Sequence, residues 1–247
     1  MEKVTFEAEK VLDYIFYDNH RTWAEIPKAV AVLDPKREDC EYPYKELCGC
    51  GVGFKLIQAM ASERGDPIDV LLPYLDLVAT AIGADIVPIT GENRVLAYHG
   101  LRVINIAPRI GFKSILDQVK KKKISISDVV FILAPRINAA GRMKHGLHAV
   151  NLLTEENEAT ALEFAAEIEK FNTDRKDADK SITIEALAQI EELKEQERYT
   201  TVVYDENWHK GVIGIVDSRL TETYYRPTLV FTKSGEKLAA SARSVKG

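Results

Sequence analysis

The sequence has few cysteines and no long apolar run, and both absences restrict the class of protein. Three cysteines in 247 residues do not form a disulfide framework, so we expect reduced cysteines and a cytoplasmic protein. No apolar run approaches the roughly 18–20 residues that a membrane-spanning helix needs, and the acidic first nine residues lack the apolar core of a signal peptide. We therefore expect no membrane partner. A composition of 46% hydrophobic and 29% charged residues also excludes a disordered or collagen-like chain.

The net charge of −5 is distributed very unevenly along the chain. Residues 99–150 contain 10 Lys and Arg against 2 Asp and Glu, whereas residues 151–200 contain 6 against 14. A basic block between acidic ones indicates an anionic ligand held in one place. The alternative, equally open at this point, is that the four lysines at 120–123 are only a solvated loop.

The hydrophobic pattern predicts an α/β fold. Short apolar runs at 12–17, 29–33 and 129–133 predict buried strands, and glycines precede a helical pattern at 54–64. Apolar side chains recur about every 3.6 residues between 154 and 197, which predicts one long helix with Thr154 as its N-cap. Strands at 201–204 and 228–232, a helix entered from a loop at 209–225, and a third strand from Leu238 follow. We expect a partial parallel sheet, a long connecting helix and the start of a second α/β domain.

The candidate metal ligands come from two places in the chain. Asp18, Asn19 and His20 follow the first predicted strand, and Asp85 lies in a later apolar stretch. Carboxylate and imidazole groups suit manganese, magnesium, zinc or iron. A two-metal phosphoesterase site needs more ligands than these, including a carboxylate that bridges the metals. That Asp18 and Asn19 merely cap a strand end therefore stays open.

Three separate segments combine cations with small residues in a way that suits phosphate. Arginine matches the geometry of a phosphate group, glycine and alanine let the backbone approach a ligand, and a helix N-terminus attracts anions. The first segment lies at 135–142, the second at 208–219, and the third, expected as a short turn, at 241–244. The candidate phosphate-binding residues in them are Arg136, Asn138, Arg142, His209, Arg219, Ser241 and Arg243.

Taken in order, these motifs resemble the RecJ single-strand-specific exonucleases of the DHH phosphoesterase superfamily. The D-N-H of residues 18–20 lies where that family carries D-H-H, and the resemblance continues nearly to the end of the chain. It is carried by L-D-P-K-R (33–37), L-C-G-C-G-V-G-F (47–54), A-D-I-V-P (84–88), P-R-I-N-A-A-G-R (135–142), W-H-K-G-V-I-G-I-V (208–216), Y-R-P (225–227) and S-A-R-S (241–244).

The resemblance implies a fold and a reaction. It implies a partial DHH domain at 1–152, a long connecting helix at 153–198 and the beginning of the DHH-associated domain at 199–247. The reaction is 5′-to-3′ hydrolysis of single-stranded DNA with a 5′ phosphate, by water activated on manganese or magnesium. Its metal positions match Asp18, His20 and Asp85, of which His20 and Asp85 also count as catalytic. The family positions that bind the terminal phosphate match Arg142, Ser241 and Arg243. The positions that line the path of the DNA strand match Arg136 and His209.

The sequence also departs from the family pattern. Asn19 replaces a metal-binding histidine, and an amide binds transition metals far more weakly than imidazole. The two acidic motifs that open the family's catalytic domain, and the segment that closes its second domain, have no counterpart. We therefore expect a central fragment with a weak or absent metal, no meaningful nuclease activity, and self-association through an unpaired strand edge. The alternatives are a non-catalytic single-stranded nucleic-acid-binding remnant and a small-nucleotide phosphodiesterase of the same superfamily.

Overall fold

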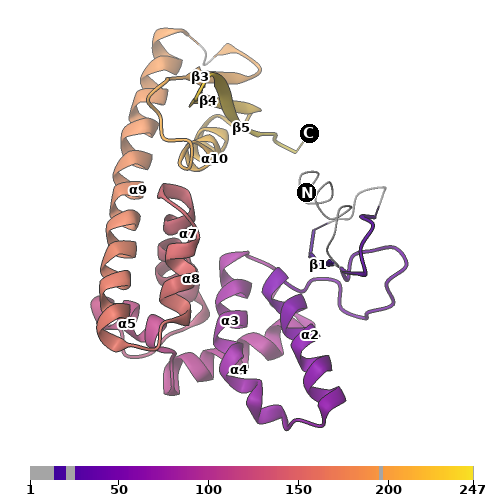
Figure 1. The fold of residues 1–247 in the computed structure, drawn as a ribbon. Helices are drawn as coiled ribbons and strands as arrows, with labels where there is room; N and C mark the ends of the chain where they lie inside the picture. Colours follow the sequence, from indigo (N-terminus) through magenta and orange to yellow (C-terminus); the bar gives the residue numbers. More distant parts are fainter. Residues whose placement is uncertain (1–13, 21–25, 195–196, 247) are drawn as a thin grey trace. The chain divides into compact units, whose positions relative to one another are not determined.

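The computed structural model describes residues 14–20, 26–194 and 197–246 (Figure 1). The chain divides into two compact units, Met1–Pro135 and Arg136–Gly247. Both units combine strands and helices, as the predicted α/β class requires. The predicted three-part division, with boundaries at 152 and 198, stays a prediction.

The first unit contains a short parallel pair of strands and a set of helices. Strand β1 (Ile15–Tyr17) pairs with β2 (Ala31–Leu33), with Ile15 opposite Ala31. The helices that follow are α2 (Gly49–Arg64), η1 (Ile68–Val70), η2 (Leu72–Tyr74), α3 (Leu75–Ala84), α4 (Gly91–Ile106), α5 (Ile110–Val119), α6 (Ile126–Asp128) and η3 (Val129–Leu133). Apolar side chains of α2, α3 and α4 form its core, with Leu33 of β2 packed against them. The strand pair is thus anchored to a helical core.

Two features hold α3 in the first unit. Gly100 of α4 lies so close to α3 that a Cβ atom there would come within 2.1 Å of the Leu75 carbonyl oxygen. The carboxylate of Asp76, which is buried, accepts hydrogen bonds from Nε and Nη2 of Arg109 at 2.7 and 2.6 Å. Since removing one partner of a buried ion pair leaves the other charge uncompensated, this pair fixes the start of α5 on α3.

The run at 129–133, predicted as a buried strand, is helical instead. A capping box starts α6, in which the Ser125 side chain accepts from the Asp128 backbone and Asp128 accepts from Ser125. The chain then continues through η3, a π-helical turn, into α7 (Ala134–Met143). Periodicity does not distinguish a strand from a buried helix in so short a β-branched run. Here the capping box just before it favours the helix.

The same capping box predicts that the stabilisation by Asp128 depends on pH. Hydrogen bonds from Lys121 and Ser125 lower the pKa of Asp128 to about 2 from its ordinary 3.8. Because the folded pKa is depressed, the stabilisation is complete above about pH 4 and is lost as the pH falls through about 2. We expect Ser125→Ala to move the pKa of Asp128 back toward 3.8, as measured by an NMR titration of the carboxyl carbon. An unchanged pKa would contradict the capping box, and Ser127→Ala, on the same exposed turn, is the control.

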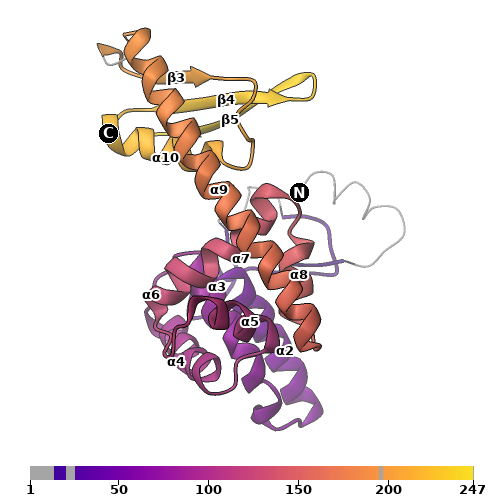
Figure 2. The same ribbon diagram turned by 90° about the vertical axis from the view of Figure 1, so that its left-hand side faces the viewer.

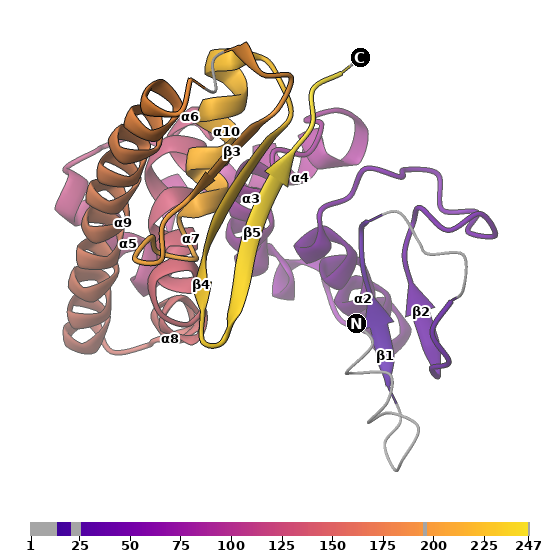
Figure 3. The same cartoon turned by 90° about the horizontal axis from the view of Figure 1, so that it is seen from above.

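The second unit is built on a three-stranded sheet. After α7 and α8 (Leu147–Thr154), the long helix α9 (Glu158–Glu192) leads to β3 (Thr201–Tyr204), α10 (Ile213–Tyr224), β4 (Thr228–Ser234) and β5 (Lys237–Arg243). The sheet order is β3-β4-β5, with β3 parallel and β5 antiparallel to β4. Figures 2 and 3 show α9 and α10 beside this sheet. Their buried side chains form one core with those of the strands and of the loop before α10, namely Ile182, Ala186, Ile190, Val203, Trp208, Val212, Ile213, Val216, Leu220 and Val230.

The long helix is confirmed, but it begins later than predicted. Its N-cap is Asn157, whose side chain accepts from the backbone of Ala159 and Thr160, while Thr154 ends α8. Asparagine caps a helix as well as threonine does, and periodicity alone does not locate the break between α8 and α9. At its other end, Gln189 pairs with both backbone groups of Tyr204, which joins α9 to the edge strand β3.

Among the described helices, none combines the length and the apolar character that crossing a membrane would require.

Candidate functional site

In the first unit, the candidate metal ligands Asp18 and His20 bind each other. Asp18 follows β1, and its Oδ1 lies 2.7 Å from Nδ1 of His20. The same oxygen accepts from the backbone N–H groups of Asn19 and His20 at 2.7 and 3.1 Å. Burial raises the pKa of Asp18, but these hydrogen bonds together hold the pKa below its ordinary value. The carboxylate thus caps the turn after β1, and a metal-binding role for Asp18 stays a prediction.

Asp85 and Asn19 lie near this turn. Burial raises the pKa of Asp85, and the nearby His20 opposes that shift only in part. A Cβ atom on Gly49, the first residue of α2, would lie 3.4 Å from the Asn19 side-chain oxygen. The chain thus brings the ends of β1 and α3 and the start of α2 toward one another, as the motifs imply.

These residues do not make up a complete metal centre. Within residues 14–20, 26–194 and 197–246, no three histidine, cysteine, aspartate or glutamate side chains come close enough together to hold a metal ion. Asp18 is already bound to His20, and Asn19 supplies only a weak amide oxygen. The donor set of the described residues therefore does not fit the two-metal site that the resemblance implies.

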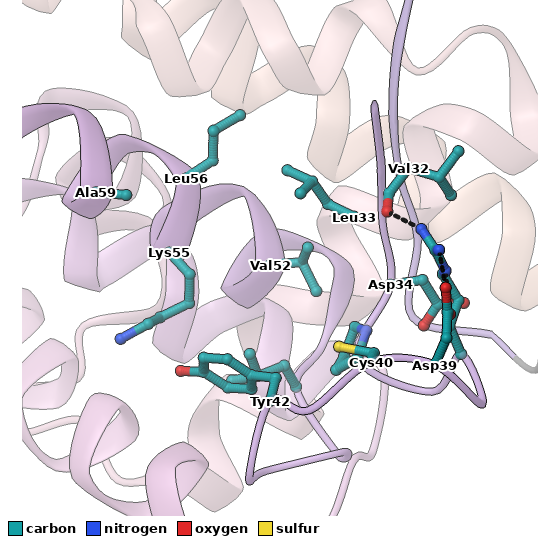
Figure 4. A pocket seen from close by; sticks show the side chains of 13 residues that line it. Val32, Leu33, Asp34, Asp39, Cys40, Tyr42, Val52, Lys55, Leu56 and Ala59 are labelled. Carbon is teal, nitrogen blue, oxygen red and sulfur yellow. Dashed lines mark hydrogen bonds and ion pairs between the residues drawn. The ribbon is translucent and has the colours of Figure 1, made fainter. Parts of the chain in front are cut away.

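A pocket of about 380 Å³ lies beside this region, between β2 and α2 (Figure 4). Its walls are mostly apolar, with Leu33, Val52 and Leu56 among them. The cations at its rim are already paired. Arg37 donates to the Val32 carbonyl and to Asp39, and the ammonium group of Lys55 lies 2.8 Å from Glu92. The pocket is thus an apolar hollow rather than a phosphate site.

In the second unit, α7 and the loop before α10 are in contact through Arg142. A Cβ atom on Gly211 would come within 2.0 Å of the Arg142 carbonyl oxygen, so only glycine fits there. Nη1 of Arg142 lies 3.4 Å from the Gly211 carbonyl oxygen, and the arginine is exposed. Nδ1 of His209 accepts from the Gly211 backbone at 3.1 Å. Two of the predicted phosphate-binding segments, 135–142 and 208–219, therefore meet at Gly211.

The third segment reaches the same helix from the sheet. Residues 241–243 belong to strand β5 and not to the expected short turn, because they pair with β4 up to Arg243 opposite Thr228. Alternation along the strand puts Ser241 and Arg243 on one face. Gly214, in the first turn of α10, faces Ser241, whose Oγ lies 3.4 Å from where a Cβ would be. Arg142, Ser241 and Arg243 thus lie around the start of α10.

The other predicted phosphate ligands differ in how accessible they are. Arg136 is largely buried and pairs with Glu169 of α9. Arg219 forms a two-pronged pair with buried Asp179, at 3.1 and 2.8 Å, which joins α10 to α9. Asn138 is exposed on α7. Each of the two arginines is therefore held by an acidic side chain of α9.

Sequence reasoning missed the acidic partners in this region. Asp217 of α10 is completely buried and lies against Ser241 and Arg243, and Asp179 holds Arg219. Each aspartate occupies a position on the apolar face of its own helix. A buried aspartate needs a hydrogen-bonding or charged partner, so an aspartate on an apolar helix face is the sequence signal that could have identified both residues.

Comparisons with known proteins agree with these motifs. The chain is 38% identical to the single-stranded-DNA-specific exonuclease RecJ of Bacillus subtilis, over 96% of this chain and 30% of the relative. It is 36% identical to RecJ of Escherichia coli, over 94% of this chain and 43% of the relative. Across the curated relatives it spans 30–45% of their length, which agrees with the predicted partial chain. No family model matches the chain.

Solved structures show the same likeness in three dimensions. RecJ from Thermus thermophilus in complex with Mn²⁺ matches with a TM-score of 0.84 at 27% identity, over 99% of this chain and 36% of that one. An exonuclease RecJ bound to manganese matches with a TM-score of 0.85 at 28% identity, over 99% and 60%. Along nearly its whole length, therefore, this chain resembles a part of the RecJ single-stranded-DNA-specific exonucleases in both sequence and fold.

Proposed function

We propose that this chain is the strand-holding part of a RecJ-like 5′-to-3′ exonuclease, and that it binds single-stranded DNA by a 5′ phosphate. The observation that carries the proposal is that Arg142, from α7, contacts Gly211 just before α10, while Ser241, from β5, faces Gly214 in the first turn of α10. Guanidinium and hydroxyl groups at a helix N-terminus are the groups that bind phosphate in proteins. The relatives, which are exonucleases specific for single-stranded DNA, support a strand as the ligand. They favour it over the small nucleotide of the alternative phosphodiesterase.

We propose further that this chain by itself is not a complete nuclease. The related structures contain Mn²⁺ or Mg²⁺, and Asp18, His20 and Asp85 are the matching positions here. The described residues do not assemble a group of three ligands, and Asn19 weakens what remains. This supports the non-catalytic strand-binding remnant as the second candidate function. In either case the chain acts on DNA, for which the cytoplasm is the expected compartment.

The short parallel sheet of the first unit supports a proposal about association. In the part of the chain that the structure describes, β1 pairs with β2 alone, and Ile15 and Tyr17 are exposed. Parallel sheets are usually covered on both faces, and an unpaired apolar edge is a template for association. We therefore propose that the chain self-associates through this edge, which sedimentation velocity at several concentrations would reveal.

The strand-binding proposal is tested by equilibrium binding of a fluorescent oligonucleotide with a 5′ phosphate, in EDTA. We expect affinity to fall as salt rises, with a slope of about −0.7 per phosphate contacted. Arg142→Ala should weaken binding by about tenfold to one hundredfold, since a charge-assisted contact contributes roughly 1.5–3 kcal/mol. Lys144→Ala removes an exposed positive charge from the segment that follows α7 and is the matched control. Equal losses in the two variants would leave only a diffuse basic surface and would overturn the proposal.

A further inference from the structure

Asp217 places a buried carboxyl group beside two of the proposed phosphate ligands. Its side chain is completely buried in α10. Ser241 Oγ donates to Asp217 Oδ2 at 2.8 Å, and Nε of Arg243 lies 3.9 Å from the same oxygen. The other oxygen, Oδ1, is buried without a hydrogen-bond partner. A buried carboxylate with one hydrogen bond and one distant cation is poorly compensated.

This arrangement changes what Ser241 and Arg243 can offer to an anion. A hydroxyl group has one proton, and here that proton points to Asp217, so toward a ligand Ser241 presents only lone pairs. The positive charge of Arg243 is partly balanced by the carboxylate before any phosphate arrives. A phosphate bound between the two residues would also lie within a few ångströms of a like charge, which is unfavourable at any dielectric constant.

We propose that Asp217 is a specificity-determining residue that weakens this site for phosphate, because its carboxylate competes with the ligand for Ser241 and Arg243. The inference rests on the proposed function, since it presupposes that Ser241 and Arg243 face a strand phosphate. The neighbouring charges do not relieve the competition, because Arg219 of α10 is paired with Asp179 of α9. Burial raises the pKa of Asp217, Ser241 and Arg243 oppose that shift only in part, and the strain on the charged form is consistent with this competition.

The test is a pair of substitutions at this position in the full chain. Asp217→Asn keeps the size of the side chain and removes its charge, and its amide can donate to Ser241 Oγ and so release the hydroxyl proton. Asp217→Ala removes the competitor altogether. We expect both variants to bind a 5′-phosphorylated oligonucleotide about tenfold more tightly than the unmodified chain. The same oligonucleotide with a 5′ hydroxyl should gain much less, because the competition is for phosphate.

The controls separate this inference from a structural role and from the proposed function. Asp177→Asn removes an exposed carboxylate from α9 of the same unit and should leave affinity within about twofold. Thermal unfolding, followed by tryptophan fluorescence, verifies that each variant is folded. If the unmodified chain binds through Arg142 but neither variant binds more tightly, the role of Asp217 is overturned and the proposed function stands. If no form of the chain prefers the phosphorylated strand, both are overturned.

Discussion

Gly100→Ala is expected to lower the free energy of unfolding of the first unit by about 3 kcal/mol, at the upper end of what overpacking in a core costs. A Cβ atom at this position would lie 2.1 Å from the Leu75 carbonyl oxygen and 2.6 Å from the Cβ of Ala79. Neither obstacle is the end of a flexible side chain. The two helices α3 and α4 must therefore separate, and the buried side chains between them lose contact.

Hydrogen exchange measured by mass spectrometry tests this expectation, because it reports on each unit separately. Peptides from α3 and α4 should exchange much faster in Gly100→Ala, while peptides from β3 and β4 should keep their protection. Gly53→Ala is the matched control. Gly53 lies inside α2 with no atom within 4 Å of the new Cβ, so alanine there should stabilise the helix by about 0.5–1 kcal/mol. Equal protection of α3 and α4 in both variants would contradict the close packing of these helices.

Gly211→Ala is expected to weaken binding of a 5′-phosphorylated strand by at least about tenfold. A Cβ atom on residue 211 would come within 2.0 Å of the Arg142 carbonyl oxygen. The loop before α10 must then move away from α7, at a cost of roughly 1–3 kcal/mol. This movement separates Arg142 from Ser241, although no side chain that would touch the ligand has been changed.

The control for this substitution is another glycine of the same unit. Gly146, at the start of α8, has no atom within 4 Å of a new Cβ and a helical backbone, so Gly146→Ala should retain affinity. A fluorescence-anisotropy titration gives the dissociation constant of each variant for the 5′-phosphorylated strand. Unchanged affinity in Gly211→Ala would show that Arg142 and the start of α10 act independently of each other.

The long helix is predicted by its hydrophobic period of about 3.6 residues, and it is present as α9. The strands at 201–204 and 228–232 are predicted from short runs rich in β-branched residues, and they are present as β3 and β4. The run at 129–133 is of the same kind, but the capping box just before it makes it helical. The composition of the run did not indicate whether it forms a helix or a strand, because the two hydrogen bonds that start the helix involve residues outside the run.

In the candidate sites, the motifs predict the ligand residues but not the residues that contact them. The motifs predict phosphate-binding groups in segments 135–142, 208–219 and 241–244, and the close contacts of Gly211 and Gly214 bring these segments together at the start of α10. Their partners came only from the structure. That Ser241 gives its proton to Asp217, or that Glu169 holds Arg136, depends on contacts between residues 24 and 33 positions apart. The spacing of residues within one motif does not predict hydrogen bonds to residues so distant in the sequence.

The claim on which this account depends is that the second unit holds a strand phosphate without a metal ion. The most direct measurement is the affinity of the full chain for a 5′-phosphorylated oligonucleotide in EDTA and in Mn²⁺, followed by electrophoresis of the strand. We predict the same dissociation constant within about twofold in both buffers, and an intact strand. Binding that appears only with Mn²⁺, or shortening of the strand at about 1 per second or faster, would contradict it.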